Sequence, residues 1–272
     1  MTFDDYLALV DAGKTIRVQA DWGQGRTTFG GMSAALVLRH AQRLVPQGHR
    51  LRSLNVTFCG PVTIDAPCVL ESTLLVSGKS VSHVTGQLSQ ATDDGPDSAK
   101  VCTLVTACFG VERTSNIIVN APVQRDLGDA GQGQVLPFVK GITPDFIQNM
   151  QLQVTEGDLP FSGSKSTRLA GWARLKATPT SFENEHLLAI IDAWPPATLP
   201  MLASFSPTSS VTWQVEFVHA NPNLQPQDWI YYACDVVQAE GGYGHTQAQV
   251  FHPNGELLAL SRQVVTIYDK KP

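Results

Sequence analysis

Apolar residues surround a single acid in residues 187–196, LLAIIDAWPP. At helical spacing, these leucines, isoleucines and the tryptophan cover nearly the whole circumference, which predicts a buried helix rather than an amphipathic surface helix. Asp192 would lose its hydration inside such a helix, so its carboxyl either needs compensating partners or stays protonated. A structural role, bonded to a nearby turn, and a functional role are equally compatible with this pattern.

The first half of the chain changes from a helical to an extended period. Apolar residues recur at helical spacing in residues 3–11, and helix-forming residues dominate 32–44, so we predict a short and a longer helix there. From Leu54 onward, apolar and polar residues alternate. Strands are predicted at 54–58, 68–77, 81–90 and 101–110, with a polar loop at 92–98 between the last two.

The second half repeats this order of elements. Residues 146–154 and 168–175 are predicted to be extended, Thr180–Glu183 fits a capping box that would start the Asp192 helix, and two prolines end that helix. Strands are predicted at 211–217, 229–237, 244–251 and 257–268. Asn254-Gly255 is the hairpin signal between the last two strands.

One offset aligns the two halves. The strand Leu54–Phe58 matches Trp213–Phe217 at a separation of 159 residues, and the same separation places Ser33 opposite Asp192. A helix wrapped by a curved antiparallel sheet, present twice, is an α+β double hotdog, which would bury both helices. We therefore expect a first repeat over residues 1–112, a linker over 113–143 and a second repeat over 144–272.

Composition and charge narrow the possible partners. Only 16% of residues are charged, against about 25% in an average domain, so we expect surface buried between repeats or subunits and a homo-oligomer. The strand 211–217 and the final strand are candidates for extending the sheet between chains. A net charge of −5 without a basic run argues against nucleic acid and an anionic membrane as partners.

Neither export nor metal binding is indicated. Asp4 and Asp5 stand where a signal peptide carries positive charge, and no long apolar run follows, so we predict a cytoplasmic protein without a membrane span. The five cysteines form no CxxC pair and are interpreted as buried thiols. His219 and His245 have no partners at metal-ligand spacing, so no metal site is expected.

In the order and spacing of its motifs, the chain resembles the double-hotdog acyl-CoA thioesterases of the acyl-CoA thioesterase II family. The segments that carry the resemblance are Phe29–Gly31, Ser53–Phe58 and the turn 78–80 in the first half, and Leu188–Pro196, Ser210–Phe217 and Asn254–Gln263 in the second. It implies hydrolysis of acyl-CoA to a free acid and CoA. That chemistry needs an activated water and a stabilised oxyanion, and no cofactor.

The resemblance also implies a catalytic site in the second repeat. The family's Asp, Thr and Gln fall on Asp192, Ser210 and Gln263, with Ser210 in place of the usual Thr. We expect Asp192 to be the general base, with a pKa raised toward neutrality by its apolar surroundings and by its place near a helix C-terminus. The first repeat has Ser33 and, at an offset of about 156, Ala107 in the matching places, so we expect one active site per chain.

Three further residues are candidates for substrate contact. Gly30 and Gly31 open the first long helix, where their N–H groups could bind an anion or where their small size could simply allow close packing. Trp213 lies on a strand where the family has other residues, and we expect it to influence substrate preference. Met32 stands where many relatives have Gln.

Two alternatives stay open at this point. A hotdog enoyl-CoA hydratase would need an Asp and a His together near the helix start, and the first half offers no such pair. A non-catalytic acyl-CoA binding or sensor protein would have a decayed site, against which the joint presence of Asp192, Ser210 and Gln263 argues.

Overall fold

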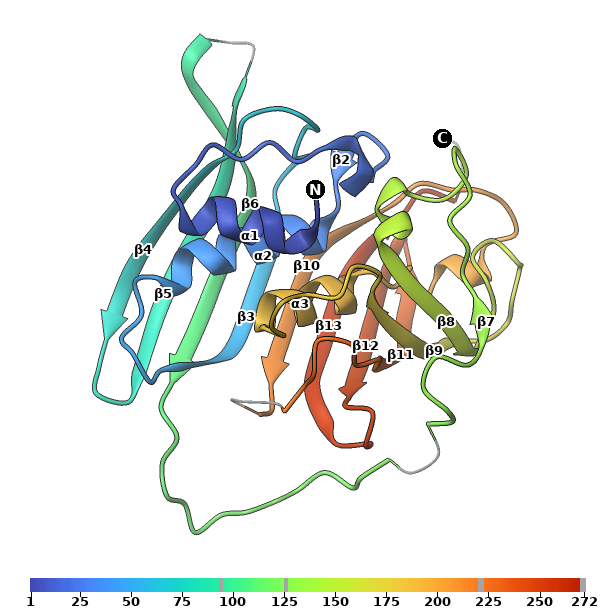
Figure 1. Ribbon diagram of the computed structural model, residues 1–272. Coiled ribbons are helices and arrows are strands. Elements are labelled where there is room, and N and C mark those ends of the chain that lie inside the picture. Colours follow the sequence, from blue (N-terminus) through green and yellow to red (C-terminus); the bar gives the residue numbers. More distant parts are fainter. Residues whose placement is uncertain (93–94, 125–126, 220–222, 270–272) are drawn as a thin grey trace.

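A single eleven-stranded antiparallel sheet dominates the described part of the chain, and its helices lie against one face (Figure 1). The computed structural model describes residues 1–92, 95–124, 127–219 and 223–269. The strand order is β4-β5-β6-β3-β10-β13-β12-β11-β9-β8-β7, and a separate two-stranded ribbon pairs β1 with β2. The helices are α1 (Phe3–Asp11), α2 (Gly30–Gln42) and α3 (Asn184–Asp192), with short 3-10 turns η1 (Ala20–Trp22), η2 (Asp145–Asn149) and η3 (Leu199–Met201). The strands are β1 (Gly23–Gln24), β2 (Thr27–Thr28), β3 (Arg50–Phe58), β4 (Val69–Ser77), β5 (Val81–Thr92), β6 (Gly95–Gly110), β7 (Gln134–Val135), β8 (Met150–Glu156), β9 (Arg168–Leu175), β10 (Thr208–Phe217), β11 (Ile230–Glu240), β12 (Tyr243–Phe251) and β13 (Leu257–Ile267).

The two repeats join edge to edge through β3 and β10. These strands pair with Trp213 opposite Val56 and Val215 opposite Leu54. An offset of 159 residues converts the first pair into the second, as a local two-fold axis between the repeats requires. The offset read from the sequence is therefore confirmed by the register of the sheet.

The expected sites of sheet extension between chains are wrong. β10 pairs with β3 on one side and β13 on the other, and β13 lies between β10 and β12. Neither strand therefore has a free backbone edge: β10 joins the two repeats through β3, and β13 is enclosed within the second repeat. The two edges of the sheet are β4 and β7.

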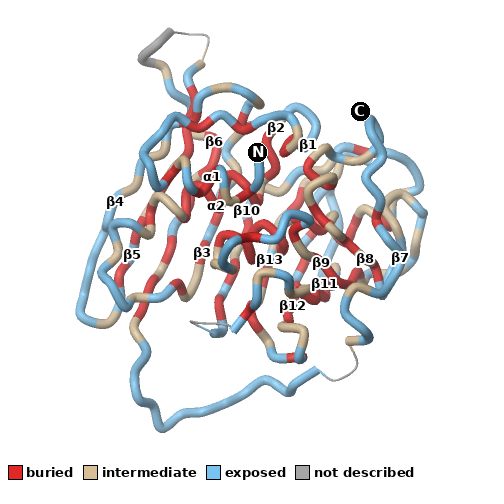
Figure 2. Tube along the Cα trace, in the orientation of Figure 1, coloured by how far each residue is buried: buried red, intermediate tan, exposed pale blue. Residues whose placement is uncertain are grey.

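Helices α2 and α3 run antiparallel in the concave face of the sheet. The start of α2 lies at the end of α3, since a Cβ on Gly31 would be 3.1 Å from the Cα of Ala189. Every residue of α3 from Glu185 to Ile191 is buried, which confirms the predicted buried helix. Figure 2 shows the buried residues concentrated on the helices and on the sheet beneath them.

Several element boundaries differ from those predicted, and at three places a predicted segment has a different local structure. Helix α3 is capped by Glu183 rather than Thr180, because the Glu183 side chain and His186 form the reciprocal capping bonds while the Thr180 N–H donates to Asp4. The predicted loop 92–98 is largely the start of β6, and its residues 93–94 lie outside the described chain. The start of the predicted strand 146–154 is the 3-10 turn η2.

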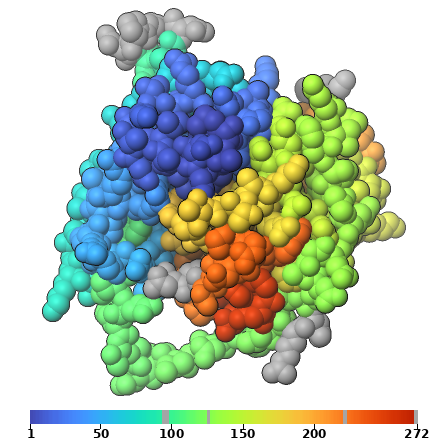
Figure 3. Space-filling view, viewed as in Figure 1, coloured from blue at the N-terminus to red at the C-terminus, as the bar shows by residue number. Residues whose placement is uncertain are grey.

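The segment after β6 extends away from the body of the molecule (Figure 3). Its aliphatic residues Ile117, Ile118 and Val119 are 82%, 78% and 90% exposed. Further along, the N–H of Gln124 donates to the Gly255 carbonyl, and β7 pairs with β8. The end of this connecting segment therefore packs against the second repeat.

A polar cluster fixes the opposite end of the α2–α3 pair. Arg39 on α2 donates two hydrogen bonds to Asp11 on α1, at 2.8 and 2.6 Å, and one to Glu183 at the start of α3. Its guanidinium also lies 3.6 Å from Glu185, which accepts a 2.6 Å hydrogen bond from Gln42. One arginine thus ties three helices together.

We predict that Arg39→Ala destabilises the fold by about 3 kcal/mol, since removing one partner leaves a buried charge uncompensated. Burial raises the pKa of Glu185 from 4.5 to about 7, so the stability of the folded state falls as pH rises from about 4.5 to about 7. The charge of Arg39 lowers the pKa of Glu185 and so stabilises the ionised carboxylate, which is the form present above pH 7. Urea unfolding should therefore show a larger loss at pH 8 than at pH 5.

The exposed Arg50, which forms no ion pair with any described residue, offers the control variant Arg50→Ala. Equal losses for Arg39→Ala at both pH values would contradict the role assigned to Glu185.

Candidate active site

Asp192 lies where the last residue of α3 meets the first turn of α2. Its Oδ1 accepts a 2.9 Å hydrogen bond from Nε2 of Gln263 on β13, and the backbone N–H of Gly31 also bonds the carboxyl. The structure therefore brings together Asp192 and Gln263, two of the three residues predicted to be catalytic. Asp192 keeps part of its surface accessible.

The pKa of the Asp192 carboxyl is raised from 3.8 to about 7, because burial disfavours the charged form. The hydrogen bonds from Gln263 and Gly31 act in the opposite direction. The rise expected from the apolar surroundings is thus found. The C-terminus of α3 is not among the causes of the shift, and the N-terminus of α2, which faces the same carboxyl, favours its charge.

Ser210 reaches the same face of the sheet through a β-bulge. Ser210 pairs with Val265 and Thr212 with Val264, so Val211 is the extra residue. Directly opposite residues share a face, and Val265 is fully buried on the inner face. The bulge turns Ser210 inward, two positions along β13 from Gln263. Its hydroxyl donates to no atom of the described residues, so its catalytic role stays a prediction.

The first two glycines of α2 are required by close packing. A Cβ on Gly30 would lie 2.8 Å from Oδ2 of Asp192 and 3.1 Å from the Phe58 ring. A Cβ on Gly31 would lie 2.6 Å from the Phe29 ring. Of the two roles considered from the sequence, close packing is what this geometry shows, and the Gly31 N–H binds the protein's own carboxylate. Contact with a substrate stays a prediction for both glycines.

Trp213 lies in the core in this structure. It is 1% exposed, and its indole N–H donates to Oγ of Ser261 at 2.9 Å. In the sheet it stands directly opposite Gln263. This packing places the indole beside the candidate catalytic pair, and the influence of Trp213 on substrate preference stays a prediction.

Three neighbours of the site were missed from the sequence. The Phe58 ring lies beside Gly30, and Thr246 stands directly opposite Gln263 on β12. Tyr232, 6% exposed, lies near enough that the Asp192 charge helps to raise its pKa well above the ordinary value, with burial as the main cause. The alternation of apolar and polar residues along each strand could show that these side chains face inward. Which strands lie next to each other is known only from the register of the sheet.

The corresponding place in the first repeat holds no acid. Oγ of Ser33, 1% exposed, donates to the Gly30 carbonyl at 2.9 Å and accepts from Thr103 at 3.1 Å. Ala107, 3% exposed, occupies the strand position that corresponds to Gln263. These contacts are compatible with the predicted single site.

Across residues 1–92, 95–124, 127–219 and 223–269, no three His, Cys, Asp or Glu side chains converge as a metal site would require. All five cysteines are free; Cys68, Cys102 and Cys234 are buried, whereas Cys59 is exposed and Cys108 partly so. Within the same described ranges, no helix combines the length and apolar character needed to cross a bilayer.

The chain belongs to the acyl-CoA thioesterase family. The family model for the acyl-CoA thioesterase N-terminal domain matches residues 18–110, and the model for the C-terminal domain matches residues 123–267. No curated protein matches the chain at a significant level.

Solved structures confirm the predicted double-hotdog fold. The chain is similar to a hotdog-fold protein of unknown function from Alicyclobacillus acidocaldarius, with a TM-score of 0.78 at 23% identity over 97% of this chain and 98% of the other. A putative thioesterase II from Thermobifida fusca gives 0.76 at 16% identity, over 98% of each chain. An acyl-CoA thioesterase II from Mycobacterium marinum gives 0.70 at 18% identity, over the whole of both chains.

We predict that Gly30→Ala displaces the Asp192 carboxyl, because the new methyl group would overlap Oδ2 at 2.8 Å. Thioester hydrolysis should fall at least tenfold while the circular dichroism spectrum is kept. The control variant Gly78→Ala adds a methyl group in an exposed turn, where the nearest atom lies at 3.3 Å, and should keep full activity. Full activity of Gly30→Ala would show that the close approach is not needed.

Proposed function

We propose that the chain hydrolyses acyl-CoA thioesters with a water molecule activated by Asp192. The observation that carries this proposal is the Asp192–Gln263 pair at the start of α2. It combines a carboxyl whose pKa is near 7 with an amide that holds one of its oxygens. A base whose pKa lies near the working pH is the most effective proton acceptor.

In the proposed reaction, the carboxylate accepts a proton as the water oxygen bonds to the thioester carbon. The tetrahedral intermediate then collapses, the carbon–sulfur bond breaks, and the proton on Asp192 is available to the departing CoA sulfur. The products are a carboxylic acid and CoA. Ser210 would orient the water from the strand side.

The developing oxyanion needs hydrogen-bond donors that are already in place. The first amides of a helix have no intrahelical acceptor, so the Gly30 N–H at the start of α2 is one donor we assign. Gln263 Nε2 carries a second hydrogen besides the one bonded to Asp192, and it is the other.

Two alternative functions lack this support. A hydratase would need a histidine beside the carboxylate, and the groups that hydrogen bond Asp192 among the described residues are Gln263 and the Gly31 N–H. A sensor protein gains nothing from a carboxyl whose burial costs stability at neutral pH, whereas a general base needs that raised pKa.

The expected result is that the purified protein releases thiol from acyl-CoA and that Asp192→Asn slows turnover by about 10²- to 10⁴-fold. The base must be deprotonated, so kcat should rise with pH through about 7 and level off above it. Stopped-assay thiol detection between pH 5 and 9 measures both effects.

Ser33→Ala alters the equivalent position of the first repeat and serves as the matched control, with expected activity close to that of the wild type. Undiminished turnover by a folded Asp192→Asn variant would remove Asp192 from the mechanism. Binding of acyl-CoA without thiol release would favour the sensor function instead.

A further inference from the structure

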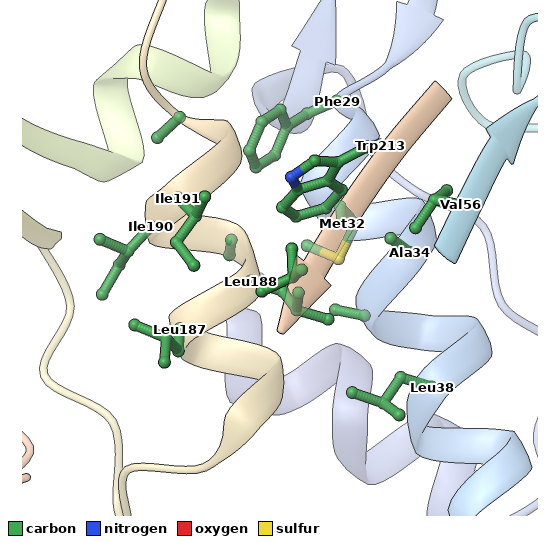
Figure 4. Packing of buried hydrophobic residues seen from close by; sticks show 14 of the residues in the cluster. Phe29, Met32, Ala34, Leu38, Val56, Leu187, Leu188, Ile190, Ile191 and Trp213 are labelled. Carbon is green, nitrogen blue, oxygen red and sulfur yellow. The ribbon is translucent and has the colours of Figure 1, made fainter. Parts of the chain in front are cut away.

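Two large buried side chains lie on the elements that carry the site: Met32 follows Gly31 on α2, and Trp213 stands opposite Gln263 in the sheet. Met32 is 0% exposed and Trp213 is 1% exposed. Figure 4 shows the Met32 sulfur close below the Trp213 indole, between α2 and β10, with Leu188 of α3 on the other side.

The Trp213 side chain is held in place from two sides. It stands opposite Gln263 in the β10–β13 pairing, so both side chains lie on the inner face, with Cβ atoms about 5 Å apart. The hydrogen bond from its indole N–H to Ser261 fixes the ring along β13. The indole therefore occupies the space next to the carboxyl's amide partner.

Exposure changes abruptly between the rim of the site and its interior. Asp192, Gln263, Ser210, Gly30 and Phe58 are all partly exposed and form the rim. By contrast, Met32 and Trp213, which lie on the same two elements as Gly30 and Ser210, have almost no accessible surface.

Two open surface cavities of the described chain lie away from the site. One of about 530 Å³ lies between residues 127–134 and Tyr231, and another of about 320 Å³ lies beside Trp22 and Leu175. Neither is lined by Asp192 or Gln263. Behind the rim, the described interior is occupied by buried side chains such as Met32 and Trp213.

We propose that Met32 and Trp213 form the floor of the acyl pocket and restrict the substrate to short acyl-CoA thioesters, from acetyl to butyryl. This inference rests on the proposed thioesterase function, and it adds which substrates the site accepts. A thioester at the rim reaches Asp192 and Gln263, whereas a longer chain meets the Met32–Trp213 pair.

Met32 is the part of this floor that substitution can remove. Its side chain is unbranched and makes no hydrogen bond, unlike the anchored indole of Trp213. Met32→Ala deletes the atoms beyond Cβ and opens space for two or three methylene groups. Each methylene buried in that space improves binding about fourfold, so the ratio of kcat/KM for hexanoyl-CoA to that for propionyl-CoA should rise about 10- to 50-fold.

Leu38→Ala is the matched control. Leu38 lies on the same helix, is also 0% exposed and is drawn further along α2, away from Trp213 (Figure 4). It should lower stability to a similar extent as Met32→Ala but leave the chain-length profile unchanged.

The experiment measures kcat/KM over acetyl- to palmitoyl-CoA for the wild type and both variants, and the binding of S-propyl-CoA and S-octyl-CoA thioethers by calorimetry. We expect the wild type to prefer short substrates and S-propyl-CoA, and Met32→Ala to shift both preferences to longer chains. A wild type that hydrolyses palmitoyl-CoA as well as butyryl-CoA would overturn the inference, as would an unchanged profile in an active Met32→Ala variant.

The thioether arm separates the two proposals. Selective binding of S-propyl-CoA without hydrolysis of any substrate would reject the thioesterase function while supporting the short-chain pocket. Hydrolysis without length selectivity would support the thioesterase function and reject the short-chain pocket. If the protein neither binds a thioether nor hydrolyses any substrate, both proposals are rejected.

Discussion

The close approach of two antiparallel helices determines the rest of this site. Gly30 and Gly31 lack the Cβ atoms that would separate α2 from α3, so the Asp192 carboxyl reaches the first amides of α2. Burial in this contact raises the pKa of the carboxyl, and the amide groups keep its charged form accessible near neutral pH. At the other end of the same helix pair, Arg39 and Glu185 hold the two helices in register.

The duplication allows the two repeats to differ at the position of Asp192. The sheet pairs β3 with β10 about a local two-fold axis, so the helix packing needs no acid: Ser33 takes the equivalent place and is satisfied within the first repeat. A raised carboxyl pKa costs folding stability at neutral pH. Packing alone therefore does not account for Asp192, which supports the chemical role proposed for it.

The helices, most strands and the two repeats could be predicted from the sequence. Hydrophobic periodicity identifies each element from neighbouring residues, and a constant spacing between similar segments reveals the repeat. The offset of 159 residues already aligned Asp192 with Ser33, and the resemblance placed Asp192 and Gln263, which the structure brings within hydrogen-bond distance. The pairing of β3 with β10 was missed, because the sequence does not show whether the edge of a strand pairs within the molecule or with another chain. The inward orientation of Ser210 depends on a β-bulge, and the burial of Met32 and Trp213 depends on packing between several elements. Neither feature can be recognised from the hydrophobic periodicity of the sequence.

The contact between α2 and α3 raises the pKa of the Asp192 carboxyl into the range that suits a general base. A carbon-13 NMR titration of the Asp192 carboxyl, assigned by the loss of its signal in Asp192→Asn, measures that pKa directly and requires no substrate. The expected midpoint is about 7. A midpoint near the ordinary value of about 4 would contradict it, because the carboxyl would then be an ordinary solvated acid at the end of a helix.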